Sequence, residues 1–548
     1  MGREQFNLAI VHDTLTSVLA ERECVVWRDR RLTYADVAER SARLAAYLHA
    51  RGLGVRVERD QLANHESGQD HVGLYLYNGN EYLEAMLGCY KARVAPFNVN
   101  YRYVEEELRY LLADARARGI VYHATFAPTL ARVLPDLPQV EVLVQVADGS
   151  GNDLLPGAVD YEAALARAPE ARPPVTPSPD DLYILYTGGT TGLPKGVLWR
   201  QHDIYLAAMG GRTLGTWDEV TSYAQIAARA EAGFPVRLLL LPPLMHGAAQ
   251  WAAFIAMGMG GTIVLPDAVD RLDAPSVLRT IEREQVNLVT VVGDAIARPL
   301  MEEMETGRYD LRSLIGVGNG GAPMSPGIKQ RLLAVVPTLL VSDSAGASET
   351  GAQMTHVSTA GSVATGTFAP GPGTTVLDDT LTRELEPGDT EIGWLAQGGA
   401  VPLGYLGDPD KTARTFPTAA GARYAVPGDR ARRLADGTIE LLGRDAVTIN
   451  SGGEKIFAEE VEQALLHHPA VADVVVAGRP SARWGSEVVA VVQLAPGADV
   501  GTEELLAEAG RHIARYKLPK AFVFVDRVER SPSGKADYRW ARQRALEA

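Results

Sequence analysis

The sequence of 548 residues contains only two cysteines, Cys24 and Cys89, and they form no closely spaced pair. This scarcity excludes a disulfide framework and a cysteine-based zinc site, and it favours a reducing cytosol, so we expect a cytoplasmic protein. No stretch offers the roughly 18 uninterrupted apolar residues of a membrane span. The N-terminus carries acid early and lacks a long apolar run. We therefore expect neither a signal peptide nor integral membrane contact.

Positive charge is also scarce. The chain has 53 lysines and arginines against 68 aspartates and glutamates, which gives a formal net charge of −15. Duplex nucleic acid is bound by concentrated cations, so this balance argues against nucleic acid as a partner. It leaves room for a small anionic ligand held by backbone amides and one or two lysines.

The overall composition is that of a globular protein, with 46% hydrophobic and 22% charged residues. At roughly 150 residues per domain, the length predicts three to four domains or subdomains. We find no internal repeat and no low-complexity tract.

Short apolar runs alternate with helical patterns over the first two thirds of the chain. Runs typical of buried strands occupy residues 72–76, 181–186, 237–241, 262–265, 286–292 and 339–342, and residues 105–113 have the spacing of an amphipathic helix. This rhythm predicts α/β layers of parallel strands with both faces covered. A proline-rich linker over residues 168–179 ends the first section.

The pattern changes after Thr374. Short strands at residues 391–396 and 438–442 predict a small β-rich piece. The last hundred residues predict helices at 458–467 and 502–515 and strands at 471–477, 488–494 and 521–525. We therefore expect an α/β protein with a large N-terminal domain, residues 1–443, of layered α/β subdomains plus the β-rich piece. A smaller α+β C-terminal domain, residues 444–548, completes the chain.

The strongest chemical signal is a glycine- and threonine-rich segment, residues 186–197, that follows a predicted strand. Glycines let backbone amides turn inward, threonines supply hydroxyl groups and a lysine supplies charge, so the segment predicts a polyphosphate cradle. The residues assigned to it are Thr187, Gly188, Gly189, Thr190, Thr191, Gly192 and Lys195. The spacing differs from that of the Walker A loop, which disfavours an ordinary P-loop ATPase. A flexible surface loop is the plainer alternative.

This segment resembles the phosphate-loop signature of the AMP-forming acyl-CoA synthetases, a superfamily that includes luciferases and peptide-synthetase adenylation domains. Further segments resemble the family's motifs in the same order along nearly the whole chain. They are residues 319–323, 344–350, 404–409, 428–430, 439–444, 451–456 and 531–535. The resemblance implies a nucleotide site that includes Gly321, Ala322 and Pro323 on the adenine side, together with Ser344, Ala345, Gly346, Ser348, Asp429 and Arg444.

The first half-reaction that the resemblance implies joins a carboxylate to the α-phosphorus of ATP, giving an acyl-adenylate and pyrophosphate. Two anions must approach each other, so the site has to supply positive charge in advance. Lys535 would bridge the carboxylate and α-phosphate oxygens, and Lys195 would hold the pyrophosphate. Glu349 with Thr187 would hold Mg²⁺, a cation that prefers oxygen ligands. Asp429 would hold the ribose hydroxyls; alone, such a residue is usually turn chemistry.

In the second half-reaction the thiol of coenzyme A attacks the adenylate. The resemblance implies that the C-terminal domain is mobile: it rotates, withdraws Lys535 and presents Ser451, Gly452 and Gly453 beside a pantetheine tunnel. Glycines suit the close approach of a slim ligand, although a tight turn alone would also explain them. A lysine near a chain end is normally a solvated surface residue, and this is the alternative for Lys535.

Four positions depart from the family pattern. Gly188 stands where the family often has serine or threonine, and Ala446 stands where it usually has aspartate or lysine. Asn450 replaces a frequent lysine, and Ala345 replaces a tyrosine that lies against adenine. A tyrosine buries on the order of 150–250 Å², so Ala345 either costs adenine contact or widens the neighbouring acyl pocket. The residue that absorbs the hinge rotation is left open.

The acyl pocket is expected beside residues 242–247. His246 would gate it or contact the substrate carboxylate, although a core role is the alternative. Its other predicted walls are Gln250, Trp251, Gly293 and Gly318. The walls are mostly small or apolar and contain no base for a second carboxylate. Together with a similarity to actinobacterial ligases, they predict a bulky hydrophobic acid, either steroid-derived or a medium- to long-chain fatty acid.

Two other functions stay open at this point. One is an acyl-AMP ligase that loads a carrier protein, since a carrier presents the same thiol arm as coenzyme A. The other is a nucleotide- or lipid-binding sensor without turnover, which the retained Lys535 and Glu349 disfavour. Related synthetases are often dimers, so a homodimer is also open.

Overall fold

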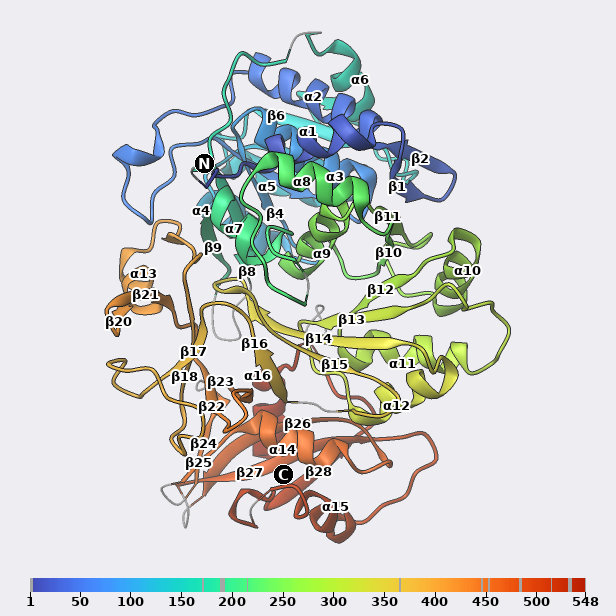
Figure 1. Ribbon diagram of the computed structural model, residues 1–548, viewed down its shortest axis with the longest axis vertical. Coiled ribbons are helices and arrows are strands. Elements are labelled where there is room, and N and C mark those ends of the chain that lie inside the picture. Colours follow the sequence, from blue (N-terminus) through green and yellow to red (C-terminus); the bar gives the residue numbers. More distant parts are fainter. Residues whose placement is uncertain are drawn as a thin grey trace.

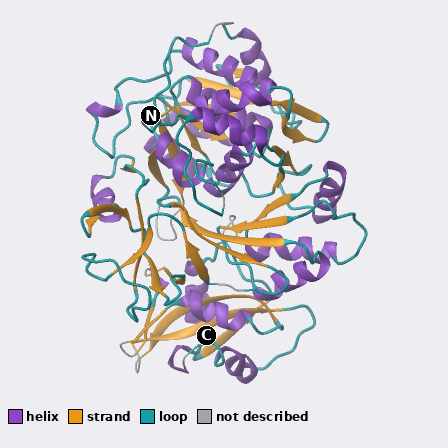
Figure 2. Ribbon diagram, viewed as in Figure 1, coloured by secondary structure: helices purple, strands orange, loops and turns teal. Residues whose placement is uncertain are grey.

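The structure is a computed structural model that describes residues 3–169, 172–187, 193–213, 215–363, 366–444, 447–451, 454–481, 485–513, 515–530 and 535–547. The N-terminal elements lie at the top of Figure 1, and the C-terminal elements form a smaller unit at the bottom. Helices flank the sheets of the larger part (Figure 2). Among the described helices, none combines the length and the apolar character of a membrane span.

The first α/β layer surrounds a sheet with the strand order β19-β9-β8-β4-β3-β5-β6-β7. Its strands are β3 (His71–Tyr75), β4 (Ala95–Asn98), β5 (Ala117–His123), β6 (Val142–Val146), β7 (Ala158–Asp160), β8 (Leu182–Thr187), β9 (Lys195–Arg200) and β19 (Gly404–Tyr405). The strands from β8 to β7 in this order pair in parallel, and β8 forms an antiparallel hairpin with β9. Every residue of β3 is buried, as the uninterrupted apolar run predicts for a central strand.

The second sheet has the order β2-β1-β11-β10-β12-β13-β14-β15-β16-β23-β22-β18-β21-β20, and β17 pairs with β18. Its first strands are β1 (Glu23–Trp27), β2 (Arg30–Thr33), β10 (Arg237–Leu240), β11 (Thr262–Leu265), β12 (Leu288–Val291), β13 (Gly316–Gly320), β14 (Leu340–Ala347) and β15 (Gly351–Ser358). The others are β16 (Thr367–Pro370), β17 (Thr374–Leu377), β18 (Gly393–Gly398), β20 (Thr418–Ala419), β21 (Ala422–Ala425), β22 (Asp429–Arg433) and β23 (Ile439–Arg444). The strands from β11 to β14 are parallel.

The β-rich piece after Thr374 is continuous with this second sheet. Strand β16 pairs with β15 on one side and with β23 on the other, both antiparallel. The chain reverses between β14 and β15, so the parallel part of the sheet passes directly into an antiparallel part. The expectation of a short-stranded segment was right, and the sheet hydrogen bonds join it to the α/β layer.

Helices cover these sheets and pack on their buried faces. In the N-terminal part they are α1 (Leu8–Leu19), α2 (Tyr34–Ala50), α3 (Asn80–Lys91), α4 (Glu105–Asp114), α5 (Ala127–Val133), α6 (Tyr161–Arg167), α7 (Gln201–Ala208), α8 (Tyr223–Ala232), α9 (Gly247–Gly258), α10 (Ala274–Glu284), α11 (Gly293–Met304), α12 (Pro326–Val335) and α13 (Pro409–Thr415). Short 3-10 helices span Arg59–Gln61, Ala124–Phe126, Leu134–Asp136 and, near the C-terminus, Arg515–Lys517.

The C-terminal unit has its own apolar cores around Val461 and Val475. Its elements are β24 (Ile449–Ser451), β25 (Glu454–Ile456), α14 (Ala458–Leu466), β26 (Val471–Ser481), β27 (Gly485–Leu494), α15 (Thr502–Ala509), β28 (Ala521–Val525) and α16 (Tyr538–Glu547). The Arg298 guanidinium of α11 donates to the Ala472 carbonyl at 2.9 Å, which ties this unit to the larger part. The boundary at residues 443/444 stays a prediction.

Several predicted elements differ in length from the observed ones; the strands expected at residues 339–342, 471–477 and 488–494 are the longer β14, β26 and β27. The helix expected over residues 502–515 ends at Ala509. Gly510 follows, and glycine costs about 1 kcal/mol relative to alanine in a helix interior. The strand expected from residue 286 begins at Leu288, because the Val286 amide still bonds to Ile281 at the end of α10.

The parallel strands place several loops at one edge. Strands β12, β13 and β14 run side by side, so their carboxyl ends meet at the same edge of the sheet. In an open α/β sheet this edge is where ligands bind. The loop after β13 carries Gly321, and the turn after β14 carries Glu349.

Candidate active site

Asn319 ties the loops of this edge together. Its side-chain amide donates to the Ala322 carbonyl at 3.0 Å and to Asp343 Oδ1 at 2.8 Å, and its oxygen accepts from the Gly293 amide at 2.7 Å. One buried side chain therefore sets the positions of the loops after β12 and β13 and of strand β14. Asn319 is the first residue of the segment 319–323 that resembles a family motif, but the sequence alone does not reveal this anchoring role.

Gly293 allows two of these loops to touch. Its φ is +55°, and a Cβ there would lie 2.7 Å from the Pro323 carbonyl oxygen. A side chain would push the predicted adenine-side loop away. On the same edge, the exposed residues are Gly321, Pro323, Ser344 and Gly346. This edge is thus open to solvent above a tightly packed base. Ala345 packs against the apolar cluster that contains Met354.

Glu349 lies in the turn between β14 and β15 and is only 9% exposed. The Tyr405 hydroxyl donates to its Oε1 at 2.7 Å. The neighbouring Ser348 carbonyl accepts from the Trp199 indole at 2.9 Å. Strands β19 and β9 of the first sheet therefore hold a turn of the second sheet. Burial and the Glu349 carboxylate raise the pKa of Tyr405, so the hydroxyl remains a donor.

Asp429 and Arg444 face each other across the β22–β23 ladder. The Arg444 Nε lies 3.4 Å from Asp429 Oδ1. Burial raises the pKa of Asp429, the Arg444 and Lys535 charges act to lower it, and Glu349 acts to raise it. The aspartate of one predicted motif, the arginine of a second and the glutamate of a third therefore share one electrostatic environment.

Lys535 comes from the C-terminal unit and reaches this same environment. Arg530 and Ala536 form an antiparallel bridge that closes the segment carrying it, and Arg530 is held by Asp473 through contacts of 2.5 and 2.8 Å. Burial by surrounding protein lowers the pKa of Lys535, and Arg444 lowers it further; Glu349 and Asp429 oppose this. The side chain keeps solvent access, so water screens part of these effects.

His246 is the residue that precedes the first turn of α9, and the Lys535 charge acts on it. Burial, together with the Lys535 and Arg102 charges, lowers the pKa of His246 to about 4. The imidazole is therefore neutral at pH 7. Its Nε2 is enclosed and makes no hydrogen bond within the described part of the chain. A neutral ring with a free nitrogen suits contact with a substrate carboxylate better than a satisfied core role does.

The other predicted pocket walls occupy different surroundings. Gln250 accepts from the Tyr183 hydroxyl at 2.7 Å and donates to the Leu244 carbonyl at 2.8 Å, so both ends of its amide are engaged. Trp251 is half-buried next to Gly247. Gly318 lies on β13 above Thr290. Their role as acyl-pocket walls stays a prediction.

The phosphate side is described at its two ends. Thr187 ends β8 and lies opposite Lys195, the first residue of β9. The Lys195 ammonium lies 3.4 Å from Asp408 Oδ2. Burial acts to lower the pKa of Lys195, but Tyr110, Asp408 and Asp114 outweigh it and raise the pKa. The predicted loop residues Gly188, Gly189, Thr190, Thr191 and Gly192 lie outside the described residues.

The thiol-side predictions are also described in part. Ser451 ends β24 and pairs with Glu454 of β25. Gly452, Gly453 and the hinge position Ala446 lie outside the described residues, and only the backbone of Asn450 is described. Their roles stay predictions.

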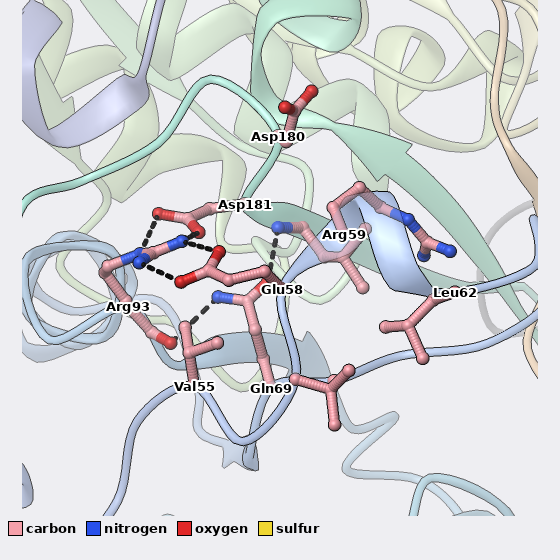
Figure 3. A pocket seen from close by; sticks show the side chains of 11 residues that line it. Val55, Glu58, Arg59, Leu62, Gln69, Arg93, Asp180 and Asp181 are labelled. Atoms are coloured by element: carbon pink, nitrogen blue, oxygen red, sulfur yellow. Dashed lines mark hydrogen bonds and ion pairs between the residues drawn. The ribbon is translucent and has the colours of Figure 1, made fainter.

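A small cavity elsewhere in the first layer carries no such chemistry. It has a volume of about 10 Å³, room for about one water molecule. Arg93 pairs across it with Glu58 at 2.8 Å and with Asp181 at 2.9 Å (Figure 3). The ion pairs satisfy one another, so this cavity is structural.

The chain is similar to known proteins over nearly its whole length. The family described as "AMP-binding enzyme" matches residues 16–406, and that described as "AMP-binding enzyme C-terminal domain" matches residues 460–535. The medium-chain acyl-CoA ligase Mig of Mycobacterium avium is 60% identical, with 99% of this chain and 98% of that protein covered. The 3-oxocholest-4-en-26-oate--CoA ligase of Rhodococcus rhodochrous is 40% identical, with 98% of this chain and 95% of that protein covered.

Solved structures share the fold. The anthranilate CoA ligase AuaEII in complex with anthranoyl-AMP superposes with a TM-score of 0.82 at 20% identity and covers 99% of this chain and 98% of its own. ATP-bound MatB from Rhodopseudomonas palustris has a TM-score of 0.79 at 22% identity, with 98% and 99% covered. These likenesses confirm the predicted mixed α/β fold with a large N-terminal and a smaller C-terminal part.

Proposed function

Because the chain belongs to the AMP-binding enzyme family, we propose that it is an ATP-dependent acid–thiol ligase that converts a hydrophobic carboxylic acid to its coenzyme A thioester through an acyl-adenylate. The family resemblance of the sequence motifs is confirmed by both family matches and by curated relatives that are named acyl-CoA ligases. One structural observation supports the proposal most directly. Lys535 of the C-terminal unit shares an electrostatic environment with Glu349 and Asp429 of the larger part.

In the first half-reaction, the residues present positive charge where two anions meet. The Lys535 ammonium would lie between the acid carboxylate and the α-phosphate, and the neutral His246 would donate to the carboxylate without adding charge. Asp429 would accept hydrogen bonds from the ribose hydroxyls. Because the protein holds these groups in place before reaction, no solvent reorganisation is needed as charge develops.

The residues on the phosphate side fit Mg²⁺. Glu349 supplies a carboxylate that Tyr405 orients, and Thr187 supplies a hydroxyl; hard oxygen ligands suit this ion. The described residues contain no cluster of three or more metal-binding side chains. A site with a single carboxylate from the protein agrees with the usual binding of Mg²⁺ through one or two carboxylates plus substrate phosphates and water. When bound, the ion would neutralise phosphate charge.

In the second half-reaction, Lys535 has to leave so that the thiol of coenzyme A can enter. This movement would break the Arg298–Ala472 contact and bring Ser451 with Gly452 and Gly453 to the site. The carrier-loading and sensor alternatives are not favoured, since the relatives at 60% and 40% identity are named coenzyme A ligases. A cytoplasmic location and a homodimer remain predictions of the sequence.

We propose a medium-chain fatty acid as the preferred substrate. The 60% identical relative is named a medium-chain acyl-CoA ligase, and the predicted walls Trp251, Gly293, Gly318 and Ala345 are apolar or small. Steroid side-chain acids are the second candidate, because the 40% identical relative is named for such an acid.

We expect the enzyme to prefer medium-chain acids over acetate. Each buried methylene contributes about 0.8 kcal/mol, so kcat/KM for octanoate should exceed that for acetate by at least about a hundredfold. Thioester formation with ATP, Mg²⁺ and coenzyme A is measured for acetate, hexanoate, octanoate, decanoate, palmitate and 3-oxocholest-4-en-26-oate. A preference for acetate would contradict the proposed acid class, and pyrophosphate release without thioester formation would contradict coenzyme A as the acceptor.

Replacing Tyr405 with phenylalanine should weaken the use of Mg²⁺. The change removes the hydroxyl that orients Glu349 and keeps the ring. Loss of such a supporting hydrogen bond typically costs about 10- to 100-fold in metal affinity or activity. The measurement is the Mg²⁺ dependence of pyrophosphate release. Tyr424→Phe is the control, because the Tyr424 hydroxyl donates to the exposed Glu384 instead. Equal Mg²⁺ dependence in both variants would contradict the role of Tyr405.

A further inference from the structure

We propose that Lys411 of α13 is a further phosphate-binding residue of this enzyme, which acts with Lys195 on the terminal phosphates of ATP and on the departing pyrophosphate. The inference rests on the proposed function and adds a residue that none of the sequence motifs singled out for chemistry. It is carried by the contacts that connect α13 to Lys195 through Asp408 and to Glu349 through Tyr405.

The Lys411 ammonium lies over the ring of Tyr405, 4.3 Å from the ring centroid. This ring is 2% exposed, and its hydroxyl holds Glu349 Oε1 at 2.7 Å. The Lys411 ammonium therefore lies on a buried aromatic ring whose hydroxyl group contacts Glu349. A cation over a buried aromatic face is held by the ring quadrupole, which limits its freedom compared with a surface lysine.

Asp408 connects the same helix to Lys195. Its Oδ1 accepts from the Lys411 backbone amide at 2.9 Å and so caps α13, while its Oδ2 lies 3.4 Å from the Lys195 ammonium. The Asp408 carboxylate therefore positions the backbone of Lys411 and also contacts the ammonium group of Lys195. Both lysines belong to one rigid assembly rather than to two independent loops.

Helix α13 is fastened to β19 as well. The Tyr405 amide donates to the Thr412 hydroxyl at 2.9 Å, and a Cβ on Gly404 would lie 2.4 Å from Thr412 Cγ2. This close packing leaves no room for α13 to slide along the strand. The packing of α13 on β19 therefore determines where Lys411 lies relative to the Tyr405 ring.

The charges of this assembly favour a bound polyanion. Burial lowers the pKa of Lys411. The negative charges of Glu349 and Asp408 act to raise this pKa, and the positive charges of Lys195 and Arg414 act to lower it. Only the Lys195 ammonium contacts the Asp408 carboxylate, at 3.4 Å, whereas Lys411 meets it through its backbone amide. The negative charge of Glu349, the residue assigned to Mg²⁺, acts on the Lys411 ammonium. Phosphate oxygens brought with the metal would supply a direct anionic partner for this ammonium. Charge-assisted hydrogen bonds of this kind are among the stronger ones in proteins.

The test is Lys411→Met in the full-length enzyme. Methionine keeps an unbranched stem against the Tyr405 ring and removes the charge. We expect binding of inorganic pyrophosphate, measured by calorimetry, to weaken about tenfold and the KM for MgATP to rise similarly. Binding of AMP, which lacks the terminal phosphates, should stay within about twofold. Lys411→Arg should restore most of the pyrophosphate affinity, because it restores a cation.

Arg414→Met is the matched control, since Arg414 is exposed on the same helix. It should bind pyrophosphate as the unaltered enzyme does. If Lys411→Met folds poorly, as judged by its melting temperature, Lys411→Gln takes its place. Unchanged pyrophosphate affinity in an active variant would overturn the assignment, and so would an equal loss of pyrophosphate and AMP binding. If the unaltered enzyme bound no nucleotide and formed no thioester, the proposed function would fail and the assignment with it.

Discussion

Replacing Lys535 with alanine should abolish acyl-adenylate formation and leave thioester formation from supplied acyl-adenylate largely intact. The Lys535 charge interacts with those of Glu349 and Asp429, where we propose that the acid and the nucleotide meet. Removing one prearranged donor to a developing charge typically costs about 10²- to 10³-fold in rate. In the proposed mechanism the lysine has left the site before the second half-reaction, so its loss should change that step by less than about tenfold.

The two steps are measured separately. Acid-dependent pyrophosphate release reports the first, and release of AMP from acyl-adenylate plus coenzyme A reports the second. Lys520→Ala is the control, because Lys520 is an exposed lysine of the same C-terminal unit. An equal loss of both steps in Lys535→Ala would refute its role as the bridge between acid and phosphate.

The second large effect is expected for Glu349→Gln. Glutamine keeps the size of the side chain and an oxygen that can accept from Tyr405, so the turn should remain folded. The change removes the charge that would hold Mg²⁺. Since a bound metal ion contributes several kcal/mol of charge stabilisation in the transition state, we expect adenylation to slow on the order of 10²- to 10³-fold.

Raised Mg²⁺ distinguishes this variant from the lysine variant. A high concentration should partly restore adenylation by Glu349→Gln and should leave Lys535→Ala inactive. Glu384→Gln is the control, since Glu384 is an exposed partner of Tyr424. Full activity of Glu349→Gln at low Mg²⁺ would contradict the assignment of Glu349 as a ligand of the metal.

The elements predicted from local patterns are those that the structure reproduces best. The uninterrupted apolar run at residues 72–76 overlaps the fully buried β3 (His71–Tyr75) in all but its last residue, and residues 105–113 fall within the helix α4. Both signals come from side chains a few positions apart, so they survive in any tertiary arrangement. The helix expected over residues 502–515 extended too far, because a single glycine and the packing beyond it decide where a helix ends.

The sequence by itself determined the family, because the motifs that carry the resemblance consist of a few consecutive residues, and the glycines, threonines and lysine of residues 186–197 alone predict a phosphate-binding segment. The tertiary structure decided how these motifs cooperate. Tyr405 supports Glu349 across 56 positions, and Lys411 lies on the ring of that tyrosine. No local pattern contains the contact between Tyr405 and Glu349, since it arises only where a short strand of one sheet meets a turn of the other.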